Sequence, residues 1–405
     1  MIIKFPSGFL WGSSISSYQV EGSNEASDWF EWERSQYLEP AGKSTNHYNL
    51  FRGDISLAHS LGHNALRFSI EWSRIYHSKN LVSRFEIDHY LDVLSFLKSK
   101  GMVPIVTLHH FTNPRWFAER GGWLRPESVD EFVSYVRTIV FQLKSYVQYW
   151  IVFNEPVVYI YNGFIEGVWP PGVKSLNEAS KALGNIMKAY VLAYSEIKRI
   201  YGRDQSYVSI AKNMRIFSPC YYFNLGQNNI FAYLRSYFFN FRIINYLISR
   251  RCLDFIGLNY YCREFVRCGK TMFGFECKDA HHEGLKNTLG WFIYPRGLYS
   301  LLMGLRRYNI PVIITENGTS ERNNTGYYRF LRSHIESVAK AISSGADVRG
   351  YLWWSLLDNF EWDKGYKHRF GLVKVDFNTF EREPRKFALE YKKICTDNAI
   401  EVNSL

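Results

Sequence analysis

The sequence lacks the patterns that mark several large classes of protein. None of its six cysteines belongs to a CxxC pair, which argues against a zinc site, and we interpret all six as buried thiols. The net charge is +11, but Lys and Arg are scattered and no run of five or more occurs. This distribution is typical of a solvated basic surface. We therefore expect no metal site and no nucleic-acid partner.

Segments that direct export or membrane insertion are also missing. Residues 1–6 lack the apolar region and the cleavage site of a signal peptide. No apolar run approaches the roughly 18 residues that a membrane-spanning helix needs. An intracellular and reducing environment is then the default, and we predict a cytoplasmic protein.

Aromatic residues, in contrast, are abundant. Of the 405 residues, 46% are hydrophobic and 18% are aromatic. Aromatic side chains at this density build cores, and they also line pockets for flat, partly apolar ligands such as sugar rings. No linker or low-complexity segment divides the chain, so we predict a single domain over residues 1–405.

Apolar, strand-like segments alternate with helical periodicity along the chain. Strands are expected at 9–14, 65–70, 103–108, 151–153, 208–211, 254–259, 312–315 and 348–355. Helices are expected at 47–61, 85–100, 128–146, 177–201, 228–251, 295–308, 327–344 and 386–395. We expect a polar loop at 18–22 and an irregular insertion at 263–290. Eight such repeats without a GxGxxG motif predict an α/β protein, a single (β/α)8 TIM barrel with loop insertions at the C-terminal face of its strands.

Two of the expected strands run directly into a glutamate. Apolar residues from Val312 lead into Glu316, and residues 149–154 lead into Glu155. Because strand ends converge on one face of a barrel, both carboxylates should meet other strand-end side chains there. Those side chains are Gln19, Arg67, His110, Asn154, Asn259, Tyr261, Trp354, Glu361 and Trp362. Two carboxylates among hydrogen-bonding groups and indoles suit the cleavage of a glycosidic bond.

Seven motifs in order support this interpretation. They are 5–12 (FPSGFLWG) with 17–22 (SYQVEG), 67–74 (RFSIEWSR), 107–111 (TLHHF), 153–156 (FNEP), 259–261 (NYY), 314–318 (ITENG) and 354–362. With these motifs, nearly the whole chain resembles glycoside hydrolase family 1, the β-glucosidase and β-galactosidase family. The resemblance implies a β-glycosidase that acts on a small carbohydrate and needs no cofactor.

The resemblance also implies a role for each site residue. Glu155 resembles the general acid/base, and Glu316 resembles the nucleophile of a retaining double displacement. Arg67 and Tyr261 would hold the nucleophile ionised, with a low pKa, and Asn259 would support the site. The carboxyl groups of a retaining enzyme lie about 5–5.5 Å apart. The sugar would be held by Asn154 at the 2-hydroxyl, by Gln19, His110, Glu361 and Trp362 at the other hydroxyls, and by Trp354 as the floor of the subsite.

Some positions separate this chain from its relatives. Phe111 stands where tryptophan is common, which could reshape contacts near the sugar. Glu361 stands where 6-phospho-β-glycosidases usually carry serine, and its charge would repel a phosphate; we interpret Lys364 and Lys367 as solvated. His109 and Arg74 are interpreted as structural.

Several alternatives stay open. The chain could be a 6-phospho-β-glycosidase or a sugar-binding barrel without turnover, although a binder needs no pair of glutamates. The aromatic stretch 231–239, together with the positive net charge, could place the protein at an anionic membrane surface. The preference between glucose and galactose and the oligomeric state do not follow from the sequence.

Overall fold

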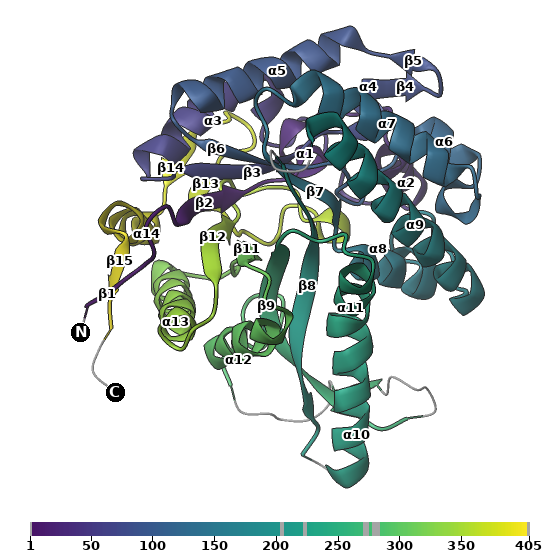
Figure 1. Cartoon of the computed structure of the whole chain (residues 1–405). Coiled ribbons are helices and arrows are strands. Elements are labelled where there is room, and N and C mark those ends of the chain that lie inside the picture. Colours follow the sequence, from purple (N-terminus) through teal and green to yellow (C-terminus); the bar gives the residue numbers. More distant parts are fainter. Residues whose placement is uncertain (1, 203–205, 222–224, 270–274, 278–283, 403–405) are drawn as a thin grey trace.

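Eight parallel strands close into a barrel in the computed structural model, which describes residues 2–202, 206–221, 225–269, 275–277 and 284–402 (Figure 1). Each strand pairs with the next in the chain, and the last pairs with the first, so the predicted TIM barrel is confirmed. The strands are β2 (Leu10–Ser14), β3 (Ala65–Ser69), β6 (Val103–Thr107), β7 (Tyr149–Asn154), β8 (Tyr207–Pro219), β9 (Ile256–Arg267), β11 (Val312–Asn317) and β12 (Val348–Trp354).

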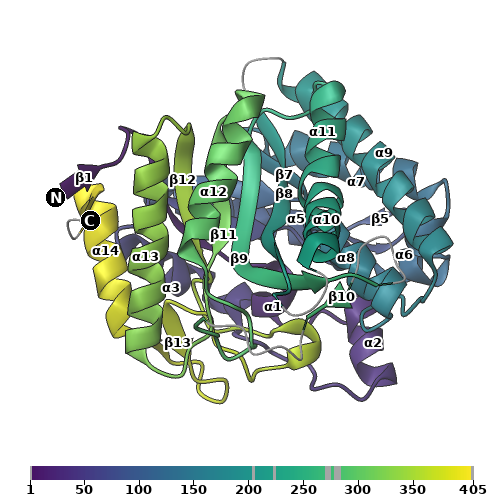
Figure 2. The same ribbon diagram turned by 90° about the horizontal axis from the view of Figure 1, so that it is seen from below.

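Helices follow the strands and cover the outside of the barrel. Figure 2 shows α12, α13 and α14 side by side next to β9, β11 and β12. The main helices are α3 (His47–Ser60), α5 (Arg84–Ser99), α7 (Ser128–Leu143), α9 (Leu176–Tyr201), α10 (Leu225–Ser236), α11 (Arg242–Ser249), α12 (Pro295–Leu305), α13 (Asn324–Ser343) and α14 (Lys386–Asp397). A π-helical stretch, η3 (Tyr237–Phe241), joins α10 to α11.

Local sequence explains where these helices begin and end. The Ser83 side chain accepts a hydrogen bond from the Glu86 backbone at the start of α5, and Ser175 caps α9 through Glu178 in the same way. Gly101 and Gly202 follow the two helices with positive φ angles of 68° and 75°. Such caps and glycines are common at the two ends of a helix.

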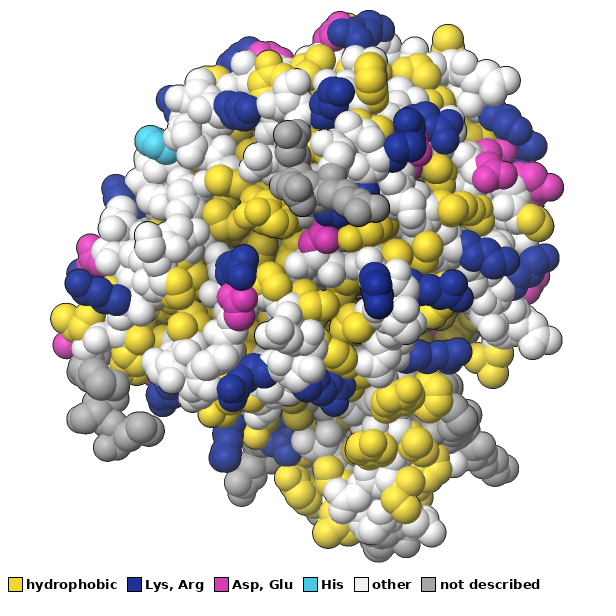
Figure 3. All heavy atoms as spheres, in the orientation of Figure 1, with side chains coloured by type: hydrophobic (Ala, Val, Ile, Leu, Met, Phe, Trp, Pro, Cys, Tyr) yellow, Lys and Arg dark blue, Asp and Glu magenta, His cyan; other side chains and the backbone are white. Residues whose placement is uncertain are grey.

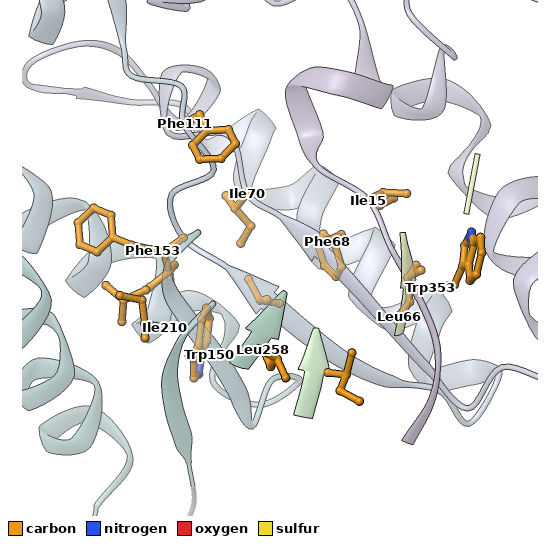
Figure 4. Packing of buried hydrophobic residues seen from close by; sticks show 14 of the residues in the cluster. Ile15, Leu66, Phe68, Ile70, Phe111, Trp150, Phe153, Ile210, Leu258 and Trp353 are labelled. Atoms are coloured by element: carbon orange, nitrogen blue, oxygen red, sulfur yellow. The ribbon is translucent and has the colours of Figure 1, made fainter. Parts of the chain in front are cut away.

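The side chains of the strands form two apolar layers. Seven barrel strands each contribute one residue to an inner cluster, which also contains Phe255 and includes Ile105, Ile151 and Leu352. A much larger cluster lies between the strands and the helices, where Trp150, Leu66 and Phe68 pack (Figure 4). Successive strand residues alternate between the layers, so each strand is packed on both of its faces.

Strands β8 and β9 continue well beyond their predicted ends. Their pairing extends from Ala211–Gly257 to Pro219–Val266, and β10 (Phe275–Glu276) adds an antiparallel strand to β9. The prediction of an irregular insertion at 263–290 is therefore wrong at its start, and part of that range lies outside the described residues. The extension was missed because its polar and charged residues interrupt the apolar run that marks a buried strand.

Two further predictions are corrected. The expected polar loop at 18–22 lies in a short, fully buried helix, α1 (Ser17–Glu21), whose five residues are too few for a periodic pattern. Cys220 and Cys277, expected as free thiols, form a disulfide between the residue that follows β8 and the residue that follows β10. The buried thiols Cys252, Cys262 and Cys395 agree with the prediction, and Cys268 is half-buried.

The two ends of the described chain meet, because β1 (Ile2–Lys4) pairs with β15 (Ala399–Glu401). Within the described residues, no helix is both long enough and apolar enough to cross a membrane. The single-domain assignment stays a prediction.

Candidate active site

Glu316, at the end of β11, lies between two side chains from other strands. Its Oε1 accepts a hydrogen bond from Arg67 Nη1 of β3 at 2.5 Å, and its Oε2 accepts one from Tyr261 Oη of β9 at 2.5 Å. The side chain of Arg67 is 1% exposed and that of Glu316 is 4% exposed. The strand ends therefore bring these three predicted residues into direct contact.

The low pKa expected for Glu316 is not found. Burial raises the pKa of this carboxyl to about 7, and the charge of Glu155 adds to the rise, while Arg67 and Tyr261 lower it. The two favourable partners alone would lower the pKa of Glu316. The barrel also removes water from around this carboxylate, and that effect raises the pKa.

Glu155 follows β7 directly and is held by two amides. Its Oε1 accepts hydrogen bonds from Asn259 Nδ2 at 2.7 Å and from Asn213 Nδ2 at 3.0 Å. Its backbone is left-handed, with φ 42°, and Pro156 begins the next helix, α8 (Pro156–Ile160). A left-handed glutamate costs free energy and persists only where the surroundings fix it, as is common in functional sites.

Asn154 connects the environments of the two glutamates. Its Oδ1 accepts hydrogen bonds from Arg67 Nη2 at 2.7 Å and from Asn259 Nδ2 at 3.2 Å, and its Nδ2 lies 3.1 Å from His110 Nε2. Burial and the charge of Arg67 hold the pKa of His110 well below its usual value, so the imidazole is neutral. Nδ1 of His110 is buried without a hydrogen-bond partner in the described part of the chain.

Aromatic rings line the same region. His110 stacks at 5.9 Å from Trp354 and at 6.2 Å from Trp362, ring centre to ring centre. The ring centre of Phe111 lies 5.3 Å from that of Trp362, in an edge-on arrangement, and 5.0 Å from that of Trp169. Trp169 is not among the predicted site residues. Phe111 and Trp362 both have positive φ angles, 73° and 50°. The structure thus brings His110, Trp354 and Trp362 together.

Gln19 contacts the loop that carries Glu361. Gln19 Nε2 donates to Phe360 O at 2.7 Å and to Asn359 Oδ1 at 3.1 Å, which anchors the loop that carries Glu361. Burial, followed by the charges of nearby carboxylates, raises the pKa of Glu361 to about 8, so its carboxyl is largely protonated at neutral pH. Its Oε2 is buried with no hydrogen-bond partner among the described residues.

No site residue is predicted on the fifth barrel strand, although the structure places one there. Asn213 is 5% exposed and contacts Glu155 directly. Its neighbour Lys212 is fully buried, and burial lowers the pKa of its ammonium group to about 7. The predicted strand ended at 211, so the polar residues that follow were not considered as strand-end residues.

The two residues interpreted as structural have structural contacts. Arg74 Nε forms an ion pair with Glu21 Oε2 at 2.7 Å, and His109 Nε2 lies 3.1 Å from Asn113 Oδ1. Among the described residues, no group of three or more His, Cys, Asp or Glu side chains could hold a metal ion.

Together, the closed barrel and the two buried strand-end glutamates define a barrel protein of the carbohydrate-cleaving class. The family described as glycosyl hydrolase family 1 matches residues 1–230 and 235–400. The chain belongs to this family and is a glycosidase.

Named relatives agree with this assignment. The chain is 32% identical to β-glucosidase A of Thermotoga maritima, over 98% of this chain and 99% of the relative. It is 29% identical to a β-galactosidase of Pyrococcus woesei, over 98% of each chain. The solved structure of a β-glycosidase from Pyrococcus horikoshii superposes with a TM-score of 0.93 at 37% identity, covering 99% of this chain and 97% of that one.

Proposed function

We propose that this β-glycosidase hydrolyses terminal, non-reducing β-linked glucose or galactose with retention of configuration, through a covalent glycosyl-enzyme intermediate. The observation that carries the proposal is the pair of glutamates in unlike surroundings. Glu316 is held by a cation and a phenol, whereas Glu155 is held by two neutral amides. Unlike surroundings are what two carboxyl groups need in order to act as nucleophile and as acid.

In the first step, a carboxylate oxygen of Glu316 attacks the anomeric carbon. The glycosidic bond breaks, its electron pair goes to the leaving oxygen, and Glu155 delivers the proton that this oxygen needs. The attack requires the ionised form of Glu316, which Arg67 and Tyr261 favour against the effect of burial. Both partners donate along hydrogen bonds that also fix the direction of the carboxylate.

In the second step, water attacks the glycosyl ester on Glu316. Esterification has removed the negative charge of Glu316, which favours the ionised form of Glu155, so Glu155 acts as the base that takes a proton from this water. The carbon–oxygen bond to Glu316 then breaks, and its electron pair returns to the carboxylate. Two inversions at one carbon give net retention, and the expected separation of about 5–5.5 Å between the carboxyls stays a prediction.

The remaining site residues would hold the sugar. We assign the 2-hydroxyl to Asn154, the other hydroxyls to Gln19, His110, Glu361 and Trp362, and the apolar ring face to Trp354. Two atoms support this assignment, because His110 Nδ1 and Glu361 Oε2 are buried without partners in the described residues. A sugar hydroxyl bound there would supply the missing hydrogen bond.

Both glucose and galactose are proposed because of the relatives. The Thermotoga maritima β-glucosidase has been solved in complex with glucoimidazole and with galacto-hydroximolactam. These neighbours are 30% identical to this chain and superpose with a TM-score of 0.90 each. Comparing kcat/KM for gluco-, galacto-, fuco- and mannosides would rank the sugars directly.

The retaining mechanism can be tested by the stereochemistry of the first product. Proton NMR during hydrolysis of an aryl β-glucoside should show the β-anomer first, and the α-anomer should follow only by mutarotation. Glu316→Gln should abolish turnover, whereas Glu119→Gln, a surface control, should not. A first product in the α-form would show that the reaction inverts.

The two lysines near Glu361 are poorly suited to bind a sugar 6-phosphate. Lys364 and Lys367 are exposed, and Lys364 is paired with Asp363. Glu361 would repel a phosphate less than expected, because its raised pKa makes this group largely neutral at pH 7. We therefore keep the 6-phospho-β-glycosidase and the non-catalytic sugar binder as disfavoured alternatives.

Location stays a prediction, with the cytoplasm favoured and a membrane surface as the alternative. Hydrophobic side chains gather on the lobe at the bottom of Figure 3, where α10 lies in Figure 1. Ile230 is 59% exposed and Tyr233 is 72% exposed on this helix. Sedimentation with anionic liposomes at low and high salt would decide between the two, because a peripheral contact weakens with salt.

A further inference from the structure

A series of polar contacts connects the arm formed by α10 and the extended strands to the carboxyl of Glu155. Arg235 of α10 forms an ion pair with Glu264 of β9 at 2.6 Å, and Glu264 also pairs with Arg215 of β8 at 3.1 Å. Arg215 Nε then donates to Asn213 Oδ1 at 3.3 Å, and Asn213 Nδ2 donates to Glu155 Oε1 at 3.0 Å. None of the steps described above uses the three charged residues of this series.

The donor from Arg215 decides which way the amide of Asn213 faces. An asparagine amide presents either its oxygen or its NH₂ group to a neighbour, and the two orientations have nearly the same shape. A guanidinium can only donate, so its contact with Oδ1 directs Nδ2 toward Glu155. Asn259 has the corresponding orientation, in which its Oδ1 accepts from Thr315 Oγ1 at 2.6 Å.

Both oriented amides donate to the same oxygen of Glu155. Oε1 accepts from Asn213 and from Asn259, and neither NH₂ group can accept a proton in return. In the acid form of a carboxyl group, the unprotonated oxygen is the better acceptor. The proton of Glu155 is therefore held on Oε2 and is kept off Oε1.

We propose that Arg215 is a positioning residue for Glu155, which acts through Asn213 and keeps the transferable proton on Oε2. The inference rests on the proposed function, because it assigns a role within that reaction. In the first step, the proton leaves Oε2 for the glycosidic oxygen, which takes the electron pair of the breaking bond while Glu316 bonds to the anomeric carbon. In the second step, a proton of the attacking water returns to Oε2.

Arg215 is itself held from several sides, as a positioning residue must be. The backbone of Arg215 exchanges two hydrogen bonds with the Asn240 side chain, at 3.0 and 2.8 Å. Its guanidinium lies 5.2 Å from the centre of the Phe239 ring, and the side chain is 29% exposed. The side chain of Glu264 is only 6% exposed, so this ion pair is largely protected from water.

The test compares substrates that differ in their need for a proton. Arg215→Met should lower kcat/KM about 10- to 100-fold for methyl or 4-methylphenyl β-glucoside, the worth of one hydrogen bond to a charged group. It should leave kcat/KM for 2,4-dinitrophenyl β-glucoside unchanged, because that leaving group departs without protonation. Arg263→Met is the matched control: it removes an arginine of β9 that bonds to Ser218 and Tyr221 and should change neither substrate.

A double-mutant cycle tests the route through Asn213. If Arg215 acts through this amide, adding Arg215→Met to Asn213→Ala should cost nothing further. Additive losses, or an equal loss for both leaving groups in Arg215→Met, would overturn the proposal while leaving the retaining function in place. If Arg215→Met does not fold, Glu264→Gln, which removes the negative charge that holds Arg215 in place, should show the same selective loss, and an unselective loss would count against the proposal. Failure of the wild type to hydrolyse any β-glycoside would instead refute the proposed function.

Discussion

Lys212 provides a test of how strongly the barrel wall desolvates charge near the site. Its side chain is fully buried and, among the described residues, it forms one hydrogen bond, to the Asn213 carbonyl, and no ion pair. Its Nζ lies 4.3 Å from the centre of the Phe239 ring. Burial lowers the pKa of the ammonium from 10.5 to about 7. We predict that Lys212→Met stabilises the protein at neutral and lower pH.

The size and sign follow from proton linkage. Between pH 7 and 10.5 the unfolded chain keeps the proton of Lys212 while the folded chain has lost it, so the free energy of unfolding rises with pH. The cost of burying the charge is therefore full below pH 7 and disappears above pH 10.5. At about 1.4 kcal/mol per pKa unit, the full cost is roughly 3–5 kcal/mol.

The measurement is the unfolding midpoint of wild type and Lys212→Met from pH 6.5 to 9.5. The difference in the free energy of unfolding between the variant and wild type should be largest at the lowest pH and should shrink by roughly 1 kcal/mol for each pH unit above 7. Losing the hydrogen bond and the ring contact changes the free energy of unfolding by an amount that does not depend on pH. The test is therefore how the stability difference between variant and wild type changes with pH. Lys188→Met, at an exposed position of α9, is the control and should keep the wild-type slope. An advantage that stays constant or grows with pH would refute the reasoning.

Three other predictions concern activity. Tyr261→Phe removes a hydrogen-bond donor that lowers the pKa of Glu316. The acid limb of the pH profile of kcat/KM, expected near pH 7, should therefore move to higher pH, and a shift to lower pH would contradict this. Glu155→Ala should lose about 10²- to 10⁴-fold in activity on poor leaving groups, and azide should partly restore turnover of an activated aryl glycoside, whereas no rescue would count against the acid/base role. Glu361→Gln should lower kcat/KM for β-glucosides by about tenfold or more, and wild type should prefer a glucoside to its 6-phosphate; the reverse preference would exclude our assignment.

The barrel and the core of the site were predictable because they depend on strand ends. Glu316, Arg67 and Tyr261 come from β11, β3 and β9, and a closed parallel barrel necessarily directs such residues to one end. Their position at one end of the barrel therefore followed from the strand ends, whereas the resemblance carried by the motifs implied their contact and their proposed roles.

The features that the sequence did not reveal depend on contacts between residues far apart in the chain. Asn213 and Arg215 were overlooked because a strand that leaves the apolar barrel no longer shows an apolar run. The partner of Cys220 could not be chosen, since spacing does not determine how cysteines pair. The raised pKa of Glu316 is a sum of opposing effects, and burial, the largest of them, is a property of the whole barrel.

The central claim is that Glu316 becomes covalently bonded to the sugar, and trapping that bond tests it most directly. A 2,4-dinitrophenyl 2-deoxy-2-fluoro-β-glucoside has a good leaving group, while its fluorine destabilises the oxocarbenium-like transition states, so the intermediate should accumulate. Mass spectrometry of the intact and digested protein should then show one fluoroglucosyl group, located on Glu316, and none on Glu316→Gln. A label on another residue, or no label together with an α-anomer as the first product, would contradict the account.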